Sequence, residues 1–395
     1  MGVAIPPPLL MVIEDVGWWK GSGNAKEGEP FRTGMGRDHF PEDYEALVRL
    51  AKKLGTQVVT GLVLCEWDRK GFLTQIPSTT WLGKEWKGCR EGGERQQKAV
   101  SILNENRAYI CPALHGVGHE YWIDGEPDRS EFHNAHGLMR DREEVLKHLW
   151  AFFRIYESMG LSLEPPRIFI PPALKHSFGN GEDGFQKMIA EFGIHFVLTV
   201  FGKARKFTPP HFPAVTEECG VVLVERGIAP VSWNHISASP VFDFDQPVLP
   251  LHWANILHRD PLRNGEVVDR WVAHLKKGVE KNEFVLLDDA LSSLRQIIIF
   301  SVSDIYRGSD GIVIDIHNAQ KILPGMLQER GFYASLPPDK TIDAQDGRIE
   351  PADHIMKNLV RIFPWKGIDA IRITKRKCGF IPAVNSSFAI PPLLF

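Results

Sequence analysis

Strand-like and helix-like patterns alternate along most of this chain, and this alternation limits the fold more than any other feature of the sequence. From residue 9 to about residue 280, short apolar runs are followed by amphipathic segments. Such an order predicts βα units around a parallel sheet. The expected strands are residues 9–13, 56–64, 109–114, 167–170, 194–200, 221–225, 228–233 and 248–251. Roughly seven or eight strands over about 270 residues favour a closed or nearly closed barrel. We therefore predict an α/β fold with a distorted (β/α) barrel of about seven parallel strands.

Five segments carry the helical periodicity that this fold needs. They are residues 41–54, 94–104, 142–159, 184–192 and 266–277. The first has acidic residues in its first turn and lysines in its last, the order that the helix dipole favours. No GxGxxG or GxxxxGK[ST] loop follows an expected strand. The usual nucleotide-phosphate sites are therefore not expected.

The pattern changes after about residue 285. Residues 296–302, 311–316 and 368–374 look like strands separated by turn residues, and few helical patterns remain. We predict a barrel over residues 1–284 and a small β-rich, sandwich-like domain over residues 285–395. No flexible linker precedes the second domain, so we expect it to pack on the barrel.

Composition argues against several classes of partner. Lys and Arg total 46 against 49 for Asp and Glu, and no basic stripe is present, which argues against nucleic acid. No run of about 18 apolar residues occurs, so we expect no membrane span. The first residues lack the basic start of a signal peptide, which favours a cytoplasmic protein. The five cysteines form no CxxC pair, which fits reduced thiols. Whether the chain forms a homo-oligomer is left open.

Two histidines follow the apolar run at residues 109–114, in the order His115-Gly116-Val117-Gly118-His119. If the chain turns helically here, this spacing places both imidazoles on one side of the turn. Two imidazoles are a start on a zinc site, which needs three or four nitrogen, oxygen or sulfur ligands. The chain has 15 histidines, so a chance pair is the alternative.

Several other polar residues also stand at the carboxyl ends of expected strands. The full set is Glu14, Asp15, Glu66, Asp68, His115, His119 and His252. In α/β barrels the active site lies at these ends. One carboxylate with two imidazoles commonly binds a divalent metal, which activates water and polarises a carbonyl group. A neighbouring carboxylate can then act as general base, and a histidine across the site as general acid.

The order of these motifs resembles the polysaccharide deacetylase superfamily, the NodB-like carbohydrate esterases. That family has a seven-stranded, often distorted barrel with a divalent metal, usually zinc. The resemblance covers about residues 9–280 and implies that Glu14 is the catalytic base. It also implies that Asp15, His115 and His119 bind the metal, the two histidines as counterparts of the family's His-Ser/Thr-x-x-His motif. By the same resemblance His252, which follows an apolar strand, is the general acid.

The chain departs from the family at four points. Glu14 replaces an Asp, and Gly116 replaces the Ser or Thr that orients the histidine loop. Ile170, before Pro171, stands where the family has an Arg that tunes the base, so that partner is missing or supplied elsewhere in the chain. Trp233, the nearest match to the fourth motif, lacks the preceding Asp.

The resemblance implies a carbohydrate substrate, most simply an N- or O-acetylated sugar. Trp18, Trp19 and Trp67 follow strand ends and, together with Pro171 and Trp233, are candidates to contact a sugar ring. A core position is the alternative for the tryptophans.

Other functions and residues stay open. The barrel could bind a saccharide without cleaving it, and it would then need no stoichiometric metal. A glycosidase or lyase would need a second carboxylate about 5–10 Å from the first, for which Glu66 and Asp68 are candidates. His317, after the apolar residues 312–316, is a second candidate for the acid. The polar clusters at residues 37–39 and 133–136 either line the site or are solvated loops.

Overall fold

A single large sheet organises the molecule. The computed structural model describes residues 2–23, 28–89, 93–241, 246–281, 283–308, 311–336 and 342–375. The sheet has eight strands in the order β10-β11-β8-β6-β3-β2-β1-β12. In chain order they are β1 (Leu10–Val16), β2 (Val58–Val63), β3 (Ile110–Gly116), β6 (Ile168–Phe169), β8 (Phe196–Thr199), β10 (Val215–Glu218), β11 (Val221–Glu225) and β12 (Val248–His252). Every neighbouring pair is parallel except β10 with β11, so seven strands run in one direction.

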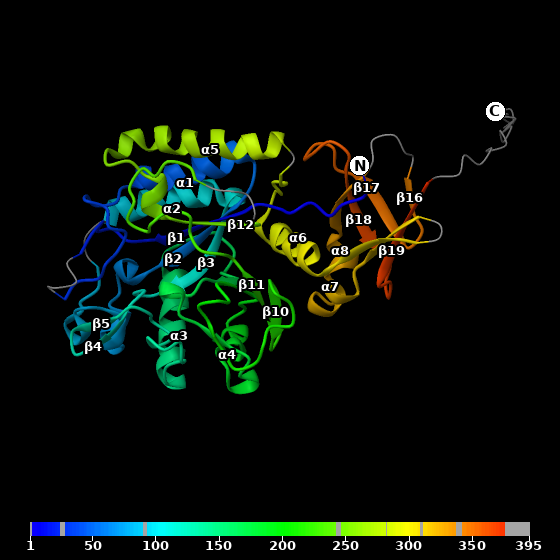
Figure 1. Ribbon diagram of the computed structural model, residues 1–395. Helices are drawn as coiled ribbons and strands as arrows, with labels where there is room; N and C mark the ends of the chain where they lie inside the picture. The colour runs from blue at the N-terminus through cyan, green and yellow to red at the C-terminus, as the bar shows by residue number, and fades with distance from the viewer. Residues whose placement is uncertain are drawn as a thin grey trace, which may run out of the picture.

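The sheet curls into part of a barrel and stays open between β12 and β10 (Figure 1). The prediction of about seven parallel strands in a mixed α/β fold is confirmed, but the nearly closed form is not reached. The chain between β11 and β12 is the reason. Residues 228–233, expected as a strand, form a loop instead.

Helices cover the outside of the sheet, with α1 and α5 on one side and α3 and α4 on the other (Figure 1). Their bounds are α1 (Pro41–Leu54), α2 (Gly93–Glu105), α3 (Arg142–Ser158), α4 (Phe185–Glu191) and α5 (Asn264–Glu280). All five were predicted from periodicity. Helix α1 matches residue for residue, because acidic and basic residues stand at the favoured ends and Gly55 closes the helix with φ 71°.

Successive side chains along each strand point to opposite faces of the sheet. On β1, Met11 and Ile13 pack in the cluster that contains the outer helices. Leu10 and Val12 face the opposite way, in a cluster with the apolar side chains of α6 (Ala290–Val302). The next inward position on β1 is Glu14, at the carboxyl end of the strand. The inner face therefore changes from an apolar core to polar side chains at that end.

Helix α6 corrects one prediction. Residues 296–302 were expected as a strand, but they belong to this helix. Asp289 caps its start, and the side chain of Asp289 accepts a hydrogen bond from the backbone N–H of Ser292 at 2.7 Å. The segment is apolar on nearly all sides because α6 packs between the barrel strands and the C-terminal strands. Because the apolar residues are not confined to one side of the helix, the sequence shows no helical period, and the pattern did not predict a helix here.

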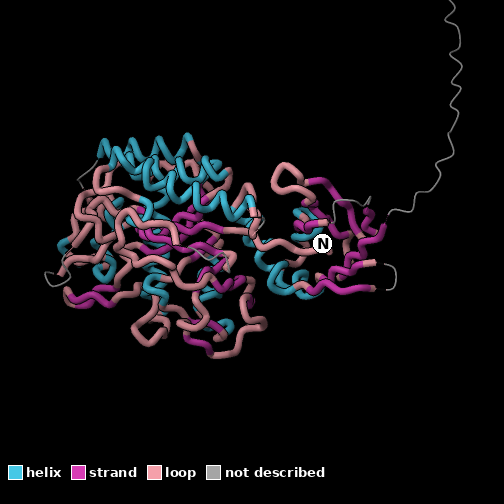
Figure 2. The backbone as a smooth tube through the Cα atoms, turned by 45° about the horizontal axis from the view of Figure 1, so that its top comes forward, coloured by secondary structure: helices cyan, strands magenta, loops and turns pink. Residues whose placement is uncertain are grey.

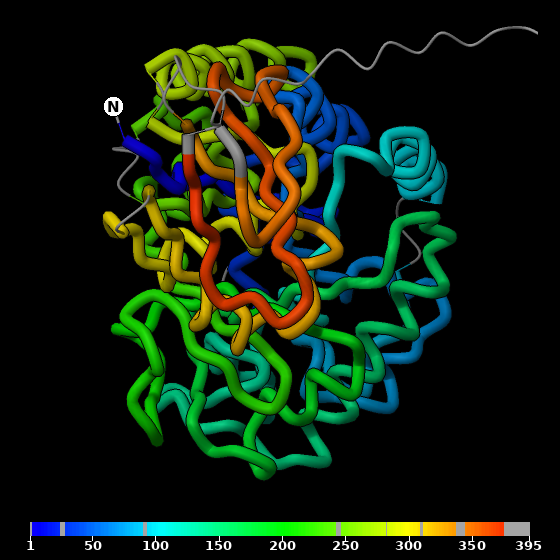
Figure 3. The backbone as a smooth tube through the Cα atoms, turned by 90° about the vertical axis from the view of Figure 1, so that its right-hand side faces the viewer, coloured from blue at the N-terminus to red at the C-terminus, as the bar shows by residue number. Residues whose placement is uncertain are grey.

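Beyond α6 the chain forms two small antiparallel sheets, with strand orders β13-β14-β19-β16 and β15-β18-β17. The strands are β13 (Asp304–Arg307), β14 (Ile312–Asp315), β15 (Phe332–Ser335), β16 (Ile342–Ala344), β17 (Gly347–Pro351), β18 (Leu359–Pro364) and β19 (Ala370–Lys375). The short helices α7 (His317–Ile322) and α8 (Met326–Arg330) lie between them. This part forms the smaller mass in Figure 2, and in Figure 3 it lies in front of the barrel. The division at residue 284 stays a prediction, since one apolar cluster runs through both parts.

The remaining elements are short. The pairs β4 (Tyr121–Ile123) with β5 (Glu126–Asp128) and β7 (Ser177–Phe178) with β9 (Arg205–Lys206) form two-stranded sheets. Cys65, Cys111 and Cys219 are free thiols, and Cys378 lies outside the described residues. Among the helices described, none has the length and apolar character that crossing a membrane requires.

Candidate active site

Three side chains from the ends of β1 and β3, which lie on either side of β2 in the sheet, meet in a buried cluster. Asp15 lies near the end of β1, His115 near the end of β3, and His119 in the turn that follows β3. One ligand atom of each lies within 4.8 Å of the other two. Asp15 Oδ1 is 3.4 Å from His115 Nε2 and 3.9 Å from His119 Nε2. The structure thus brings together the three residues expected to bind a metal.

The orientation of both imidazoles fits a divalent metal. His115 donates a hydrogen bond from Nδ1 to the carbonyl oxygen of Ile170 at 2.8 Å, which leaves Nε2 as the unprotonated nitrogen of the neutral ring. His119 Nδ1 lies 3.3 Å from Glu120 Oε1, so its Nε2 also faces Asp15. An outer partner on the far nitrogen is the usual support of a metal-binding histidine.

Asp15 is ready to act as an anionic ligand. Burial alone raises the pKa of this carboxyl group, but its contacts with the imidazoles of His115, His119 and His252 act in the opposite direction. The net result is a pKa of Asp15 well below its ordinary value. The carboxylate is therefore charged at neutral pH, as a hard metal ligand must be.

The turn between the two histidines is not helical, contrary to the expectation from their spacing. Gly116 has φ 137° and His119 has φ 63°, in the left-handed region. A Cβ on Gly116 would meet Glu131 Oε2 at 2.3 Å, and one on Gly118 would meet the carbonyl oxygen of Thr79 at 2.2 Å. Both glycines are therefore needed for close approach, not only for flexibility.

Glu131 holds this turn, and the sequence analysis did not identify it. Its Oε2 accepts hydrogen bonds from the backbone N–H groups of Gly118 and His119, both at 3.1 Å. Its Oε1 lies 2.8 Å from His148 Nδ1, and His148 Nε2 lies 2.8 Å from Ser78 Oγ. Glu131, His148 and Ser78 are all buried. Glu131 therefore does what the missing hydroxyl at position 116 would do, which is to fix the loop that carries His119.

Glu14 is next to this cluster and pairs with Arg226. The two form a buried ion pair between Oε1 and Nη1, with 3% and 2% of the residues exposed. Burial lowers the pKa of Arg226 to about 9, so its guanidinium stays charged at neutral pH. Arg226 supplies the partner that Ile170 cannot. The sequence contains a pattern that could have identified Arg226. Val222 and Val224 of β11 face inward, and Arg226 is the next residue in that alternating series.

His252 lies on the other side of Glu14. The two residues are register partners on β12 and β1, and His252 Nε2 is 3.9 Å from Glu14 Oε2. Burial lowers the pKa of His252 to about 4, although the negative charge of Asp15 raises it. The imidazole is neutral at neutral pH, and its buried Nδ1 has no hydrogen-bond partner among the described residues.

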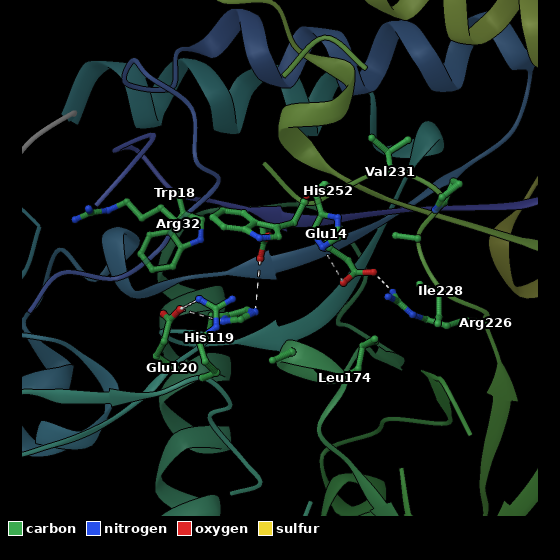
Figure 4. Close-up of a pocket in the computed structure, with 17 residues that line it drawn as sticks. Glu14, Trp18, Arg32, His119, Glu120, Leu174, Arg226, Ile228, Val231 and His252 are labelled. Atoms are coloured by element: carbon green, nitrogen blue, oxygen red, sulfur yellow. Dashed lines mark hydrogen bonds and ion pairs between the residues drawn. The ribbon is translucent and has the colours of Figure 1, made fainter. Parts of the chain in front are cut away.

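These groups line one pocket of about 360 Å³ at the carboxyl ends of the strands (Figure 4). Trp233 belongs to its lining and is partly exposed, as the sugar-contact hypothesis requires. Trp18 also borders the pocket but is only 1% exposed, so it offers no free ring face to a sugar. Arg32 and Arg129, which the sequence did not single out, line the pocket as well. Their contact with a substrate stays a prediction.

Three of the other candidates lie away from the pocket lining. Trp19 packs on Trp67 with ring centroids 5.1 Å apart, and Trp67 Nε1 donates to the carbonyl oxygen of Gly17 at 2.8 Å. Both are buried core residues, so neither offers a free ring face to a sugar. Pro171 is also buried, and its neighbours Ala173 and Leu174 reach the pocket instead.

The two carboxylates proposed for a glycosidase have structural partners. Glu66 Oε2 accepts from the backbone N–H of Trp19, and its Oε1 pairs with Arg32 Nε at 3.0 Å. Asp68 accepts hydrogen bonds from two backbone N–H groups at residues 72 and 73 and from Trp86 Nε1. Neither residue lines the pocket that contains Glu14. This removes the structural basis for a second catalytic carboxylate at these positions.

The remaining histidines and loop clusters have other roles. His317 begins α7, is half-exposed and pairs with Asp369 at 3.0 Å, remote from the pocket lining. In the cluster at residues 37–39, Arg37 and His39 both pair with Asp43. In the cluster at residues 133–136, His133 is fully buried rather than solvated.

Comparison with known proteins gives no family for this chain. No family model and no curated protein matches the sequence. A crystal structure of a proposed glycoside hydrolase/deacetylase from Parabacteroides distasonis is similar over 79% of this chain and 82% of that chain, at 10% identity and a TM-score of 0.38. A similarity this low says nothing of what this chain binds or cleaves.

Proposed function

We propose that this protein is a metal-dependent hydrolase that removes an acyl group, most simply acetyl, from a nitrogen or oxygen atom of a carbohydrate. The observation that carries the proposal is the position of the Asp15–His115–His119 cluster directly beside the buried Glu14–Arg226 pair, at a pocket that Asp15, His119, Glu14 and Arg226 line. A ligand set with free Nε2 atoms and an adjacent held carboxylate is the arrangement that metal-assisted hydrolysis needs. The carbohydrate part of the proposal rests on the motif order and on Trp233, which lines the pocket and is partly exposed.

Asp15, His115 and His119 would hold the metal, for which zinc is our proposal because of its preference for imidazole and carboxylate. When bound, it would lower the pKa of a water molecule and polarise the carbonyl group of the substrate. Glu14 removes the proton of the attacking water. Arg226 keeps the carboxylate of Glu14 charged and fixes its direction through their ion pair.

His252 completes the proton path. Because its imidazole is neutral at neutral pH, it needs a proton before it can act as an acid. Glu14 Oε2, 3.9 Å from His252 Nε2, can supply the proton that it has taken from water. His252 then protonates the leaving amine or alkoxide, and the proton count of the reaction balances.

Elemental analysis of the purified protein tests this proposal first. We expect about one divalent transition metal per chain, lost in His115→Ala and kept in His354→Ala, a matched control at an exposed histidine. The metal-loaded wild type should release acetate from N- or O-acetylated sugars, and Glu14→Gln should reduce kcat by about 10²–10⁴-fold.

Two results would contradict the proposal. One is a wild-type protein that takes up no metal even after reconstitution. The other is metal binding that survives His115→Ala. Saccharide binding without metal or acetate release would instead support the non-catalytic alternative.

A further inference from the structure

One side of the active-site pocket is apolar. It is formed by Ala173, Leu174, Ile228, Ala229, Pro230 and Val231, which we call the apolar wall. Ile228 is 59% exposed, in a chain that buries most of its large aliphatic side chains. Pro230 is also exposed, and the other four are partly buried. Apolar residues that are accessible inside a pocket indicate contact with an apolar part of a ligand.

The backbone at the apolar wall is held in an unfavourable conformation. Ala173 and Leu174 are consecutive residues with φ 50° and φ 59°, in the left-handed region that residues with a Cβ atom disfavour. Neither is a glycine, so the conformation is maintained by its surroundings. It places Leu174 on the pocket, opposite the side from which His252 enters (Figure 4). Strain of this kind collects at functional sites.

The other end of the pocket is polar. Arg32, Glu120 and Arg129 line it, and Arg129 Nη1 donates to Glu120 Oε1 at 3.3 Å. The guanidinium of Arg129 also lies 3.9 Å from the ring centre of Phe31. In Figure 4, Arg32 and Glu120 are drawn on one side of Glu14, Ile228 and Val231 are on the other side with the buried Arg226, and Leu174 lies below Glu14. The reacting groups therefore lie between a polar end and an apolar end.

We propose that the acyl group removed by this protein is longer than acetyl, and that its chain lies along the apolar wall. This inference rests on the proposed function. The hydroxyl-rich sugar fits the polar end, so the acyl chain is left with the apolar end. The methyl group of an acetyl could touch only part of a wall of six residues, whereas a chain of several carbons can reach from Leu174 toward Val231. The substrate class is then an acylated sugar with a short- or medium-chain aliphatic acyl group.

A series of p-nitrophenyl esters with a constant leaving group tests the inference on the metal-loaded protein. Burial of each additional methylene is expected to raise kcat/KM about three- to fourfold, so butyrate should exceed acetate about tenfold. Ile228→Ser should reduce that butyrate-to-acetate ratio by several-fold. Leu262→Ser, at a residue that is 83% exposed and outside the pocket lining, should keep the wild-type ratio.

The outcomes separate this inference from the proposed function. Acetate-ester hydrolysis that depends on His119, combined with a ratio of one or below, would overturn the acyl-chain proposal and leave the hydrolase proposal standing. An unchanged ratio in Ile228→Ser would also overturn it. If no p-nitrophenyl ester is hydrolysed, thermal shifts with acetate, butyrate and hexanoate test the wall directly. Stronger stabilisation by the longer acids, lost in Ile228→Ser, would support it, and equal shifts would overturn it.

Discussion

Replacing Arg226 with Met should destabilise the protein strongly, because it leaves the carboxylate of Glu14 buried without its partner. Glu14 and Arg226 are 3% and 2% exposed, so water cannot replace the lost guanidinium. Removing one member of such a pair typically costs about 3–5 kcal/mol. A domain has roughly 5–15 kcal/mol of stability in total, so the loss is a large fraction of it. Urea denaturation followed by tryptophan fluorescence would measure the change.

The double variant Glu14→Gln/Arg226→Met should recover most of this loss. Neither buried charge is then present, and an apolar side chain of similar length fills the space of the arginine. Arg226→Met alone should therefore be less stable than the double variant, and the coupling energy between the two sites should be about 0.5–3 kcal/mol, as for other residues in contact. Neither variant should retain full turnover, since one lacks the base and the other its partner.

A surface pair provides the control. Arg49 and Asp269 also form a close ion pair, 2.8 Å apart, but their side chains are 45% and 43% exposed. Arg49→Met should cost no more than about 1 kcal/mol. If Arg226→Met costs as little as Arg49→Met, or if adding Glu14→Gln brings no recovery, the argument from the buried charge is wrong.

Two further predictions concern the support of the site and the core. Glu131→Gln should weaken metal affinity about 10–100-fold, because it disturbs the contacts to the backbone N–H groups of Gly118 and His119 and to His148. Competition with a chelator would measure the affinity. An affinity equal to that of Glu157→Gln, a control at an exposed residue, would refute the prediction. Burial lowers the pKa of His176 from 6.5 to about 3, so the unfolded chain binds more protons between these values and stability falls as pH drops from about 6.5 toward 3. His176→Phe should make the loss of stability over this range smaller by up to roughly 5 kcal/mol, and an unchanged pH dependence of the urea midpoint would contradict this assignment.

The large features of the fold could be predicted because they depend on local patterns. The bounds of α1 follow from its terminal charges and Gly55, and the strands follow from short apolar runs. The carboxyl ends of parallel strands lie on one edge, so Asp15 and His115 could be placed together before any coordinates were known. The candidate metal-binding cluster was within reach of sequence reasoning for this reason.

The failures concern contacts between residues far apart in the chain. The conformation of His119 depends on Glu131, twelve residues later, and on the approach of Thr79, so the spacing of the two histidines could not reveal it. The helix α6 lacks an amphipathic pattern because it is buried between two parts of the molecule. The core positions of Trp19 and Trp67 likewise depend on packing with Tyr44 rather than on their place after a strand.

Arg226 shows how such a residue can be found across strands rather than along the chain. Each inward-facing series of side chains ends in one position at the carboxyl edge of the sheet. These last positions are Glu14, His115, Ile170, Arg226 and His252. A charged base at one of them needs a cation at another, but the fold does not require that the cation come from a particular strand. The side chain of Ile170 is apolar, so it cannot pair with Glu14. The positive charge comes instead from Arg226, which directly follows β11. The pairing rule for buried charges, applied to this set of positions, would have identified Arg226 from the sequence, whereas a search along one motif could not.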